Sequence, residues 1–198
     1  MKSDNRPVFI KNPEPVTDIA VSASIRPGWN EKIFTFEKEA EIRKNKPVLQ
    51  RPCRVLVYST KAKPGNPGLC LDRYGDTLRL GKVFPINYAA AERMGLTLLD
   101  GKIIGEFTCD RITEFKVFQN GSIQNWNFAD LDKSCVPYEQ VVDYIGFGRV
   151  GYAWHITDPV LYETPIILSD AHEVFELAAP LLQSPQSWIY AWPKERRL

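Results

Sequence analysis

The sequence predicts an α+β fold, mainly β, in which short strands form a partly closed mixed barrel flanked by short helices. Short runs of strand-like residues dominate the chain, and only a few helical patterns lie between them. Strands and helices do not alternate regularly, as they would in a doubly wound sheet. With 198 residues, 44% of them hydrophobic, the chain can bury a substantial core as one domain.

The first 18 residues are expected to form an extended arm, and the domain would then cover residues 19–198. Pro7, Pro13 and Pro15 interrupt this arm, which shows little periodicity. It has no uninterrupted apolar stretch of the kind that an export signal needs, and no run in the chain approaches the roughly 20 apolar residues of a membrane helix. We therefore expect a cytoplasmic protein with no membrane partner.

In the first half of the domain, alternating apolar residues predict three strands, at residues 19–25, 40–43 and 51–60. Pro27 suits a first helical turn, and Trp29 and Ile33 follow at helical spacing, so a short helix is predicted after the first strand. A turn rich in proline and glycine is expected at residues 64–68, and another helix near residues 88–94.

The second half contains the most strand-like run of the chain, at residues 101–115, with Glu106 inside it. The polar residues 119–134 predict a loop, and the run PYEQVVDYIG at residues 137–146 predicts a helix. Two strands and a helical run are predicted for the remainder, at residues 152–156, 187–192 and 171–177 respectively.

The cysteines and histidines do not suggest a metal site. The four cysteines contain no Cys-x-x-Cys pair and are typical of buried free thiols in a reducing compartment. Only His155 and His172 could join them, so zinc ligands in the usual spacing are lacking. His155 is better explained as a packed, hydrogen-bonded strand residue. No glycine-rich phosphate loop occurs, and no metal or cofactor is expected.

The net charge of +1 hides one strongly basic stretch. Residues 43–63 contain no Asp or Glu and seven cations, namely Arg43, Lys44, Lys46, Arg51, Arg54, Lys61 and Lys63. Such a stretch attracts phosphates and releases their counterions, which predicts salt-sensitive binding to nucleic acid. The alternative is a solvated strand edge that Lys and Arg protect from pairing.

Aromatic residues in strand-like runs offer surfaces on which bases could stack. Tyr58 lies within the basic stretch, and Tyr152, Trp154 and Trp188 occur in later strand-like runs. The alternative for each ring is a place in the hydrophobic core, which is where most aromatic side chains lie.

Seven blocks of the chain, in order, resemble the ASCH (ASC-1 homology) family of the PUA-like superfamily. They are SIRPGWNEKIF, EKEAEIRKNKP, RVLVYSTK, GKIIGEFTCDRI, GYAWHITD, LYETPIILSD and SPQSWIYAW. The resemblance implies a PUA-like pseudo-barrel with a cleft beside the first helix. Residues 65–100 and 115–148 then look like two insertions, through which a protein partner could bind.

The resemblance also implies a site, because a Lys-x-x-Glu-x-Arg strand lines the cleft in this family. Lys38, Glu41 and Arg43 match that pattern and could hold a phosphate or the polar edge of a base. The alternative is an exposed ladder of weak ion pairs. For RNA, a single strand or a modified nucleotide, the expected binding residues are Lys38, Arg43, Lys44, Lys46, Tyr58, Lys61, Trp154 and Trp188.

A second function follows from relatives of this family that deacetylate 4-acetylcytidine with a Lys, a Thr nucleophile and a Glu. Lys38 matches the Lys and Glu106 the Glu, but Glu41 stands at the position of the nucleophile and cannot act as an activated hydroxyl. If the protein is an enzyme, Lys38, Glu41 and Glu106 would have to activate a water instead. The alternative is a structural carboxylate paired with Lys38 or Arg43. Binding is therefore the first expectation, and amidohydrolysis of an acylated nucleoside the second.

Overall fold

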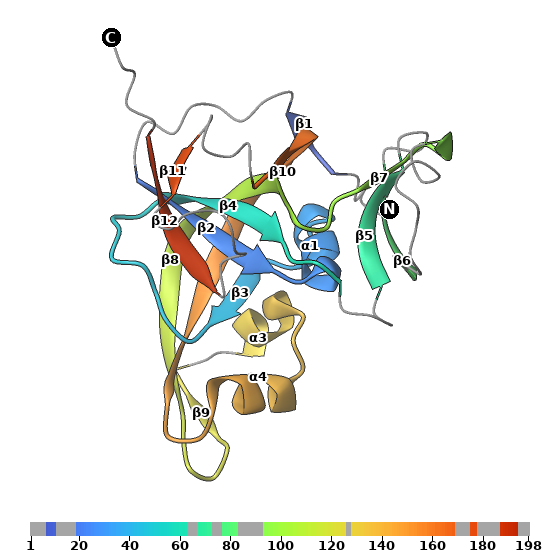
Figure 1. Ribbon diagram of the computed structural model, residues 1–198. Coiled ribbons are helices and arrows are strands. Elements are labelled where there is room, and N and C mark those ends of the chain that lie inside the picture. The colour runs from blue at the N-terminus through green and yellow to red at the C-terminus, as the bar shows by residue number, and fades with distance from the viewer. Residues whose placement is uncertain are drawn as a thin grey trace.

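The structure is a computed structural model that describes residues 7–10, 19–62, 67–72, 77–82, 93–125, 128–168, 175–177 and 187–193 (Figure 1). Its strands are β1 (Phe9–Ile10), β2 (Ala20–Ile25), β3 (Ala40–Arg43), β4 (Cys53–Ser59), β5 (Pro67–Asp72), β6 (Thr77–Lys82), β7 (Leu96–Leu98), β8 (Lys102–Val117), β9 (Ile123–Gln124), β10 (Val150–Ile167), β11 (Phe175–Leu177) and β12 (Trp188–Pro193). Its helices are α1 (Pro27–Phe34), α3 (Phe128–Ser134) and α4 (Tyr138–Ile145).

A nine-stranded sheet forms the larger part of the fold. Its strands follow the order β1-β10-β8-β4-β2-β12-β11, with β3 paired to β10 and β9 paired to β8. The long strands β8 and β10 pair antiparallel, whereas β2 and β4 pair parallel. Strands β5, β6 and β7 form a separate sheet in the order β6-β5-β7. In Figure 1, α1 lies between the two sheets.

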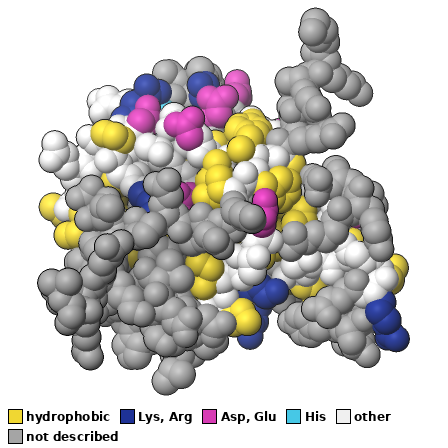
Figure 2. All heavy atoms as spheres, turned by 90° about the horizontal axis from the view of Figure 1, so that it is seen from above, with side chains coloured by type: hydrophobic (Ala, Val, Ile, Leu, Met, Phe, Trp, Pro, Cys, Tyr) yellow, Lys and Arg dark blue, Asp and Glu magenta, His cyan; other side chains and the backbone are white. Residues whose placement is uncertain are grey.

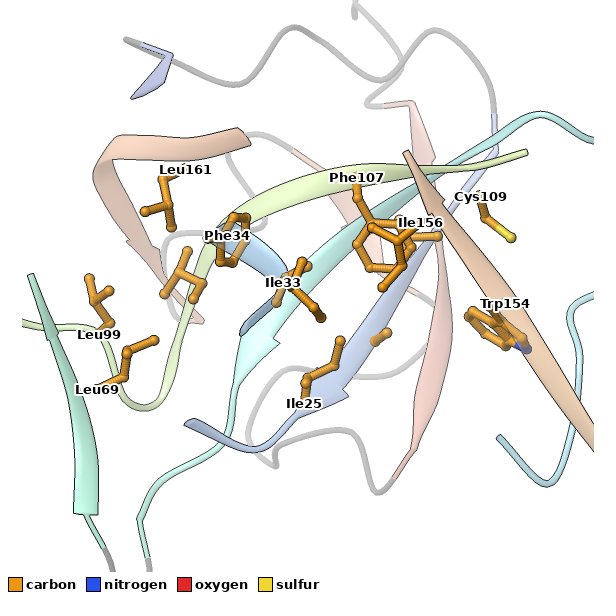
Figure 3. Close-up of a cluster of buried hydrophobic side chains, with 14 of the residues drawn as sticks. Ile25, Ile33, Phe34, Leu69, Leu99, Phe107, Cys109, Trp154, Ile156 and Leu161 are labelled. Carbon is orange, nitrogen blue, oxygen red and sulfur yellow. The ribbon is translucent and has the colours of Figure 1, made fainter. Parts of the chain in front are cut away.

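Both faces of the large sheet are buried. Successive residues of a strand point to opposite faces, so each strand contributes side chains to two separate clusters. On the first face, Ile33 and Phe34 of α1 pack into a cluster with Phe107, Trp154 and residues of the small sheet (Figure 3). A second cluster covers the opposite face and consists of Ala20, Leu56, Tyr58, Ile103, Tyr162 and Ala191. Buried carboxylates on the two faces therefore have different neighbours.

Helix α1 approaches the sheet at Gly105. A Cβ at this position would lie 2.2 Å from the carbonyl oxygen of Val160 and 2.9 Å from the ring of Phe34. A larger residue would therefore clash with the backbone of β10 and with the Phe34 ring of α1. The end of α1 matters for the site because the connection from α1 to β3 carries Lys38.

Helix α4 fixes β3 through a third cluster. Val141, Val142 and Ile145 of α4 are buried against Ile42 of β3 and Phe115 of β8. Since Ile42 points towards this cluster, its neighbours Glu41 and Arg43 point to the other side of the strand. The polar residues of β3 thus face the first core.

The predicted α+β, mainly β class is confirmed, but several local predictions are wrong. Residues 67–68 begin β5 instead of a turn, residues 119–134 contain β9 and α3, and residues 175–177 form β11 instead of a helix. Strand β10 is also far longer than the predicted 152–156. The helix predicted near residues 88–94 and the helical residues 171–174 lie almost entirely outside the described residues.

The expected barrel does not close over the described residues. Strands β1 and β11 are the two ends of the large sheet and do not pair with each other, so the sheet is curved but open. The N-terminal arm contributes to this edge, because β1 pairs parallel with β10. None of the described helices is long and apolar enough to cross a membrane.

Candidate functional site

Lys38 lies at the end of the α1–β3 connection and is almost completely buried, with 1% of its surface exposed. Its Nζ donates to the carbonyl oxygen of Ser134 at the end of α3 and lies 3.4 Å from Oε2 of Glu41. Burial lowers the pKa of Lys38, although Glu41 opposes the shift. The amine is therefore easier to deprotonate than that of an exposed lysine.

Glu41 bridges two cations. Its Oε1 lies 3.0 Å from Nη2 of Arg43, while Oε2 faces Lys38. The guanidinium of Arg43 also donates to the carbonyl oxygens of Ser24 at 2.9 Å and Ser187 at 3.1 Å. Arg43 thus joins β3 to β2 and to the residue before β12, and the three charged side chains form one buried network, which we call the Glu41 network.

Every cation between residues 38 and 46 lies over an aromatic ring. The pairs, with distances from the cation to the ring centroid, are Lys38 and Trp29 at 5.1 Å, Arg43 and Trp154 at 5.9 Å, Lys44 and Tyr144 at 5.1 Å, and Lys46 and Tyr152 at 4.9 Å. We call this set the cation–aromatic ladder. The cations of its first two pairs are buried, whereas Lys44 and Lys46 are exposed. The ladder therefore runs from the interior to the surface.

Two buried donors within the ladder have no hydrogen-bond partner among the described residues. They are the Nε of Arg43 and the indole Nε1 of Trp154. Buried donors are nearly always paired with protein or with ordered water, so each of these calls for an acceptor. The two belong to neighbouring side chains, because Arg43 lies over the Trp154 ring.

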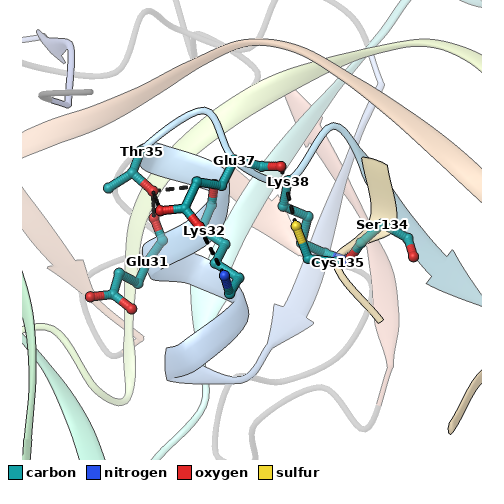
Figure 4. A network of polar contacts seen from close by, with 7 residues as sticks. All are labelled: Glu31, Lys32, Thr35, Glu37, Lys38, Ser134 and Cys135. Atoms are coloured by element: carbon teal, nitrogen blue, oxygen red, sulfur yellow. Dashed lines mark hydrogen bonds and ion pairs between the residues drawn. The ribbon is translucent and has the colours of Figure 1, made fainter. Parts of the chain in front are cut away.

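A second polar network lies beside Lys38, at the end of α1 (Figure 4). Lys32 pairs with Glu37 at 2.8 Å, and Thr35 donates to the carbonyl oxygen of Glu31. The thiol of Cys135 donates to the carbonyl oxygen of Glu37. These contacts hold the chain between α1 and Lys38 and connect it to the residues that follow α3.

Glu106 is not part of the Glu41 network. One of its carboxylate oxygens accepts hydrogen bonds from Arg54 of β4 and from the hydroxyl of Tyr162. Burial beside Glu106 raises the pKa of Tyr162 above its ordinary value. The structure therefore brings Lys38 and Glu41 together, as the sequence suggested, and gives Glu106 different partners.

The aromatic residues of the expected binding set differ in their exposure. Tyr58 is 2% exposed and lies in the second core, so its ring is covered. Trp154 is buried but contacts Arg43 and, at 6.1 Å between ring centroids, the partly exposed Trp188. Trp188 in turn makes an edge contact with Tyr190.

The basic stretch, residues 43–63, contains no acidic residue, but acidic residues from elsewhere in the chain lie close to it in the structure. Carboxylates from other strands approach three of its cations: Glu41 approaches Arg43, Glu106 approaches Arg54, and Glu114 lies 3.2 Å from Lys46. Lys61 is exposed and packs its stem against Gly101, away from the ladder. Lys63 lies outside the described residues.

Trp29 and Tyr144 were not predicted as binding residues, although each contributes a ring to the ladder. Tyr152, which also contributes a ring, was predicted only as a possible stacking surface. The sequence could have indicated Tyr144, because the buried residues of its helix are Val141, Val142 and Ile145 and an aromatic ring on the polar side of the helix is not needed for the core. His155 accepts a hydrogen bond from Arg111 and contacts Thr113, as expected for a packed histidine. The described residues contain no group of three His, Cys, Asp or Glu that could hold a metal ion.

The fold is similar to that of solved ASCH proteins. A crystal structure of ASCH from Zymomonas mobilis superposes with a TM-score of 0.55 at 18% sequence identity and covers 89% of this chain and 88% of its own. A serine-to-alanine variant of the Zymomonas mobilis protein gives a TM-score of 0.54 at 16% identity, with 91% and 92% covered. A tyrosine-to-phenylalanine variant gives 0.54 at 16%, with 89% and 91% covered.

The chain therefore has the ASCH fold, and the resemblance predicted from the ordered blocks is confirmed for the fold. No protein-family model matches the sequence, and no curated protein matches it significantly. At this level of identity the likeness concerns the arrangement of the backbone and not the ligand.

Proposed function

We propose that the protein binds RNA, as a single strand or through a modified nucleotide, at the cation–aromatic ladder. The observation that carries the proposal is that all four cations between residues 38 and 46 lie over aromatic rings. Cations supply contacts to phosphates, and aromatic faces supply stacking for unpaired bases. The resemblance to ASCH domains implies the same class of ligand.

The outer and inner parts of the ladder have different roles in this proposal. Lys44 and Lys46 are exposed and would contact phosphates, while the Tyr144 and Tyr152 rings beneath them offer faces to bases. The unpaired donors on Arg43 and Trp154 would meet acceptors of a nucleotide that reaches the inner part. Lys61, which packs elsewhere, would contribute little, and Trp188 would border the inner part.

The test is the binding of a labelled oligouridylate of about 12 nucleotides, a length within the usual site sizes of single-strand binders. Fluorescence anisotropy would be measured from low to moderate salt for the wild type and for the double variant Lys44→Ala/Lys46→Ala. Because single strands release about 0.7 counterion per phosphate contact, losing both lysines should reduce the salt slope by about 1.4. The affinity in low salt should fall in parallel.

Lys133→Ala is the matched control. Lys133 is an exposed lysine that pairs with Glu39 at 2.6 Å, much as Lys46 pairs with Glu114, but Lys133 does not belong to the ladder. The control should bind as the wild type does. Equal slopes for the wild type and the double variant would contradict the proposal.

We propose hydrolysis of an acylated nucleoside as the second candidate, because burial lowers the pKa of Lys38 beside a carboxylate. In this reaction water would cleave the amide bond of 4-acetylcytidine and give cytidine and acetate. Chromatography of the products formed by the wild type, Lys38→Met and Glu106→Gln would decide it. Activity lost only in Lys38→Met would support a Lys38–Glu41 site, and no turnover by the wild type would exclude this reaction.

A further inference from the structure

A fifth cation–aromatic pair lies outside the ladder. Lys116 is 5.7 Å from the centroid of the Phe118 ring, near the end of β8. Together with β9 and the residues that lead from α4 into β10, this region forms a tip at the bottom of Figure 1, comprising residues 116–125 and 146–150. We call it the hairpin tip.

The hairpin tip exposes two phenylalanine rings. Phe147 is 54% exposed and Phe118 is 38% exposed. Phe147 stands between Gly146 and Gly148, whose φ angles of 93° and 73° are ones that residues with a side chain rarely adopt. A Cβ at Gly121 would lie 3.6 Å from the Phe147 ring, so this ring borders the β8–β9 turn. The backbone thus presents Phe147 to the solvent.

Backbone contacts hold the two halves of the hairpin tip together. The amide of Val117 donates to the carbonyl oxygen of Arg149 at 2.9 Å, and Lys116 is directly opposed to Val150. Val150 is itself 36% exposed. The segments that carry Lys116 and Phe118, and Phe147 and Arg149, are therefore neighbours in the hairpin tip.

The charge of the hairpin tip fits a polyanion. The hairpin tip contains no Asp or Glu, and its cations Lys116 and Arg149 are both exposed. The nearest carboxylates along the chain are Glu114 and Asp143, which lie just outside the tip. The far side of the molecule differs: among the described residues visible from above in Figure 2, cations and carboxylates are interspersed. Exposed carboxamides of Gln119, Gln124 and Asn125 add donors and acceptors of the kind that pair with base edges.

The hairpin tip is continuous with the cation–aromatic ladder at two points. Tyr144, which lies under Lys44, precedes Phe147 by three residues. Tyr152, which lies under Lys46, is two residues from Val150 on the same strand and therefore on the same face, at a spacing of about 7 Å. A strand bound at the ladder could therefore continue onto the tip.

We infer that the hairpin tip is a second contact site for single-stranded nucleic acid, in which Phe118 and Phe147 stack on unpaired bases and Lys116 and Arg149 contact phosphates. This inference rests on the proposed function, since it extends the same ligand beyond the ladder. It also gives a role to part of the segment 115–148 that the sequence analysis treated as an insertion.

The test compares oligouridylates of about 4 and about 12 nucleotides, the shorter of which fits the ladder alone. The double variant Phe118→Ala/Phe147→Ala should bind the longer strand at least about fivefold more weakly, because losing one base–aromatic stack costs at least that factor. Its affinity for the shorter strand should stay unchanged. Phe118→Leu/Phe147→Leu, which keeps the apolar bulk without the ring face, should show the same loss.

Phe36→Ala is the matched control, because Phe36 is a phenylalanine of similar exposure, 43%, that follows α1 instead of belonging to the tip. If the tip variants bind the longer strand normally while Lys44→Ala/Lys46→Ala weakens both strands, the tip inference fails and the proposed function stands. If the lysine variant binds both strands normally, the proposed function fails.

A protein partner is the remaining alternative for the exposed rings. If the protein self-associates in sedimentation experiments, and Phe147→Ala abolishes association without changing binding of the longer strand, the tip is a protein-docking surface and the inference is overturned.

Discussion

Glu41 and Glu106 are both carboxylates held by cations, but they lie on opposite faces of the large sheet. Glu41 is directly opposed to Trp154, which belongs to the first core. Glu106 precedes Phe107 of that core and therefore points to the other face, where it meets Tyr162 of the second core. Each acid is thus fixed by a different set of neighbours.

The comparison shows that a buried charge is not enough to identify a site. The Glu106 cluster consists of one cation, one hydroxyl and one carboxylate joined by hydrogen bonds. The Glu41 network adds a second cation and two indole rings, and each of its cations lies over one of these rings. The contacts between cations and indole rings distinguish the surroundings of Glu41.

The largest predicted effect is the loss of stability in Glu41→Gln. This change leaves Lys38 and Arg43 buried without their counter-charge, and removing one partner from a buried pair costs about 3–5 kcal/mol. Glu106→Gln should cost less, about 1–3 kcal/mol, since Arg54 is 22% exposed and can recover water. Urea unfolding of the two variants measures both free energies.

Glu114→Ala is the control for these two variants, because Glu114 pairs with Lys46 at the surface and is 55% exposed. Its free energy of unfolding should stay within about 0.5 kcal/mol of the wild type. Equal losses in Glu41→Gln and Glu106→Gln would break the comparison between the two faces.

The sequence was sufficient to predict the class of the fold and most of its strands. Clear alternation of apolar residues predicts the strands β2, β3, β4, β8 and β12. Helical spacing after Pro27 predicts the short helix α1. The length of β10 was missed because its pairing with β8 passes through several register shifts, and Asp158 and Pro159 lie within it. Such shifts break the pattern of period two while the strand continues.

The candidate site was predicted only in part. The spacing of Lys38, Glu41 and Arg43 placed them together correctly, because they lie on one strand and its approach. The separation of Glu106 from Lys38 depends on which face of β8 carries Glu106, and a strand buried on both faces gives no signal for this. The rings of Tyr144 and Tyr152 reach the ladder only through tertiary packing of α4 and β10.

The next effect in size concerns pH and tests the buried state of Lys38. Its pKa is lowered in the folded protein, whereas an unfolded lysine titrates near about 10.4. Between these two values the unfolded chain binds more protons, so the stability of the wild type should rise with pH in that window. At pH values below the pKa of Lys38 in the folded protein, Lys38 is protonated in both states, so its contribution to the free energy of unfolding should not change with pH.

Lys38→Met provides the reference for this prediction, because it keeps the apolar stem and lacks the titrating amine. The difference in free energy of unfolding between the wild type and Lys38→Met should become more favourable to the wild type as pH rises towards about 10.4. Urea unfolding at a series of pH values measures it. A difference that stays constant with pH would show that Lys38 is as solvated as an ordinary surface lysine.

The smallest effect concerns a second polar pair in the first core, with no counterpart around Glu106. Cys53 of β4 and Cys109 of β8 are directly opposed, and both are free and buried. The adjacent Cys109 thiol, assisted by the Arg51 cation, lowers the pKa of Cys53 to about 7, although the Cys109 thiol also lies within hydrogen-bonding distance of the carbonyl oxygen of Arg111. Alkylation of Cys53 in the folded protein, followed by peptide mapping, should therefore reach half its maximal rate near pH 7, since the thiolate is the reactive form.

Two variants of Cys109 test the cause of this midpoint. Cys109→Ser keeps a hydrogen-bond donor and should preserve the midpoint. Cys109→Ala removes the donor and should move the midpoint towards about 8.5, the pKa of an unperturbed thiol. The same midpoint in both variants would mean that the Cys109 thiol does not stabilise the Cys53 thiolate. This pair of cysteines would then not distinguish the face of the sheet that carries Glu41 from the face that carries Glu106.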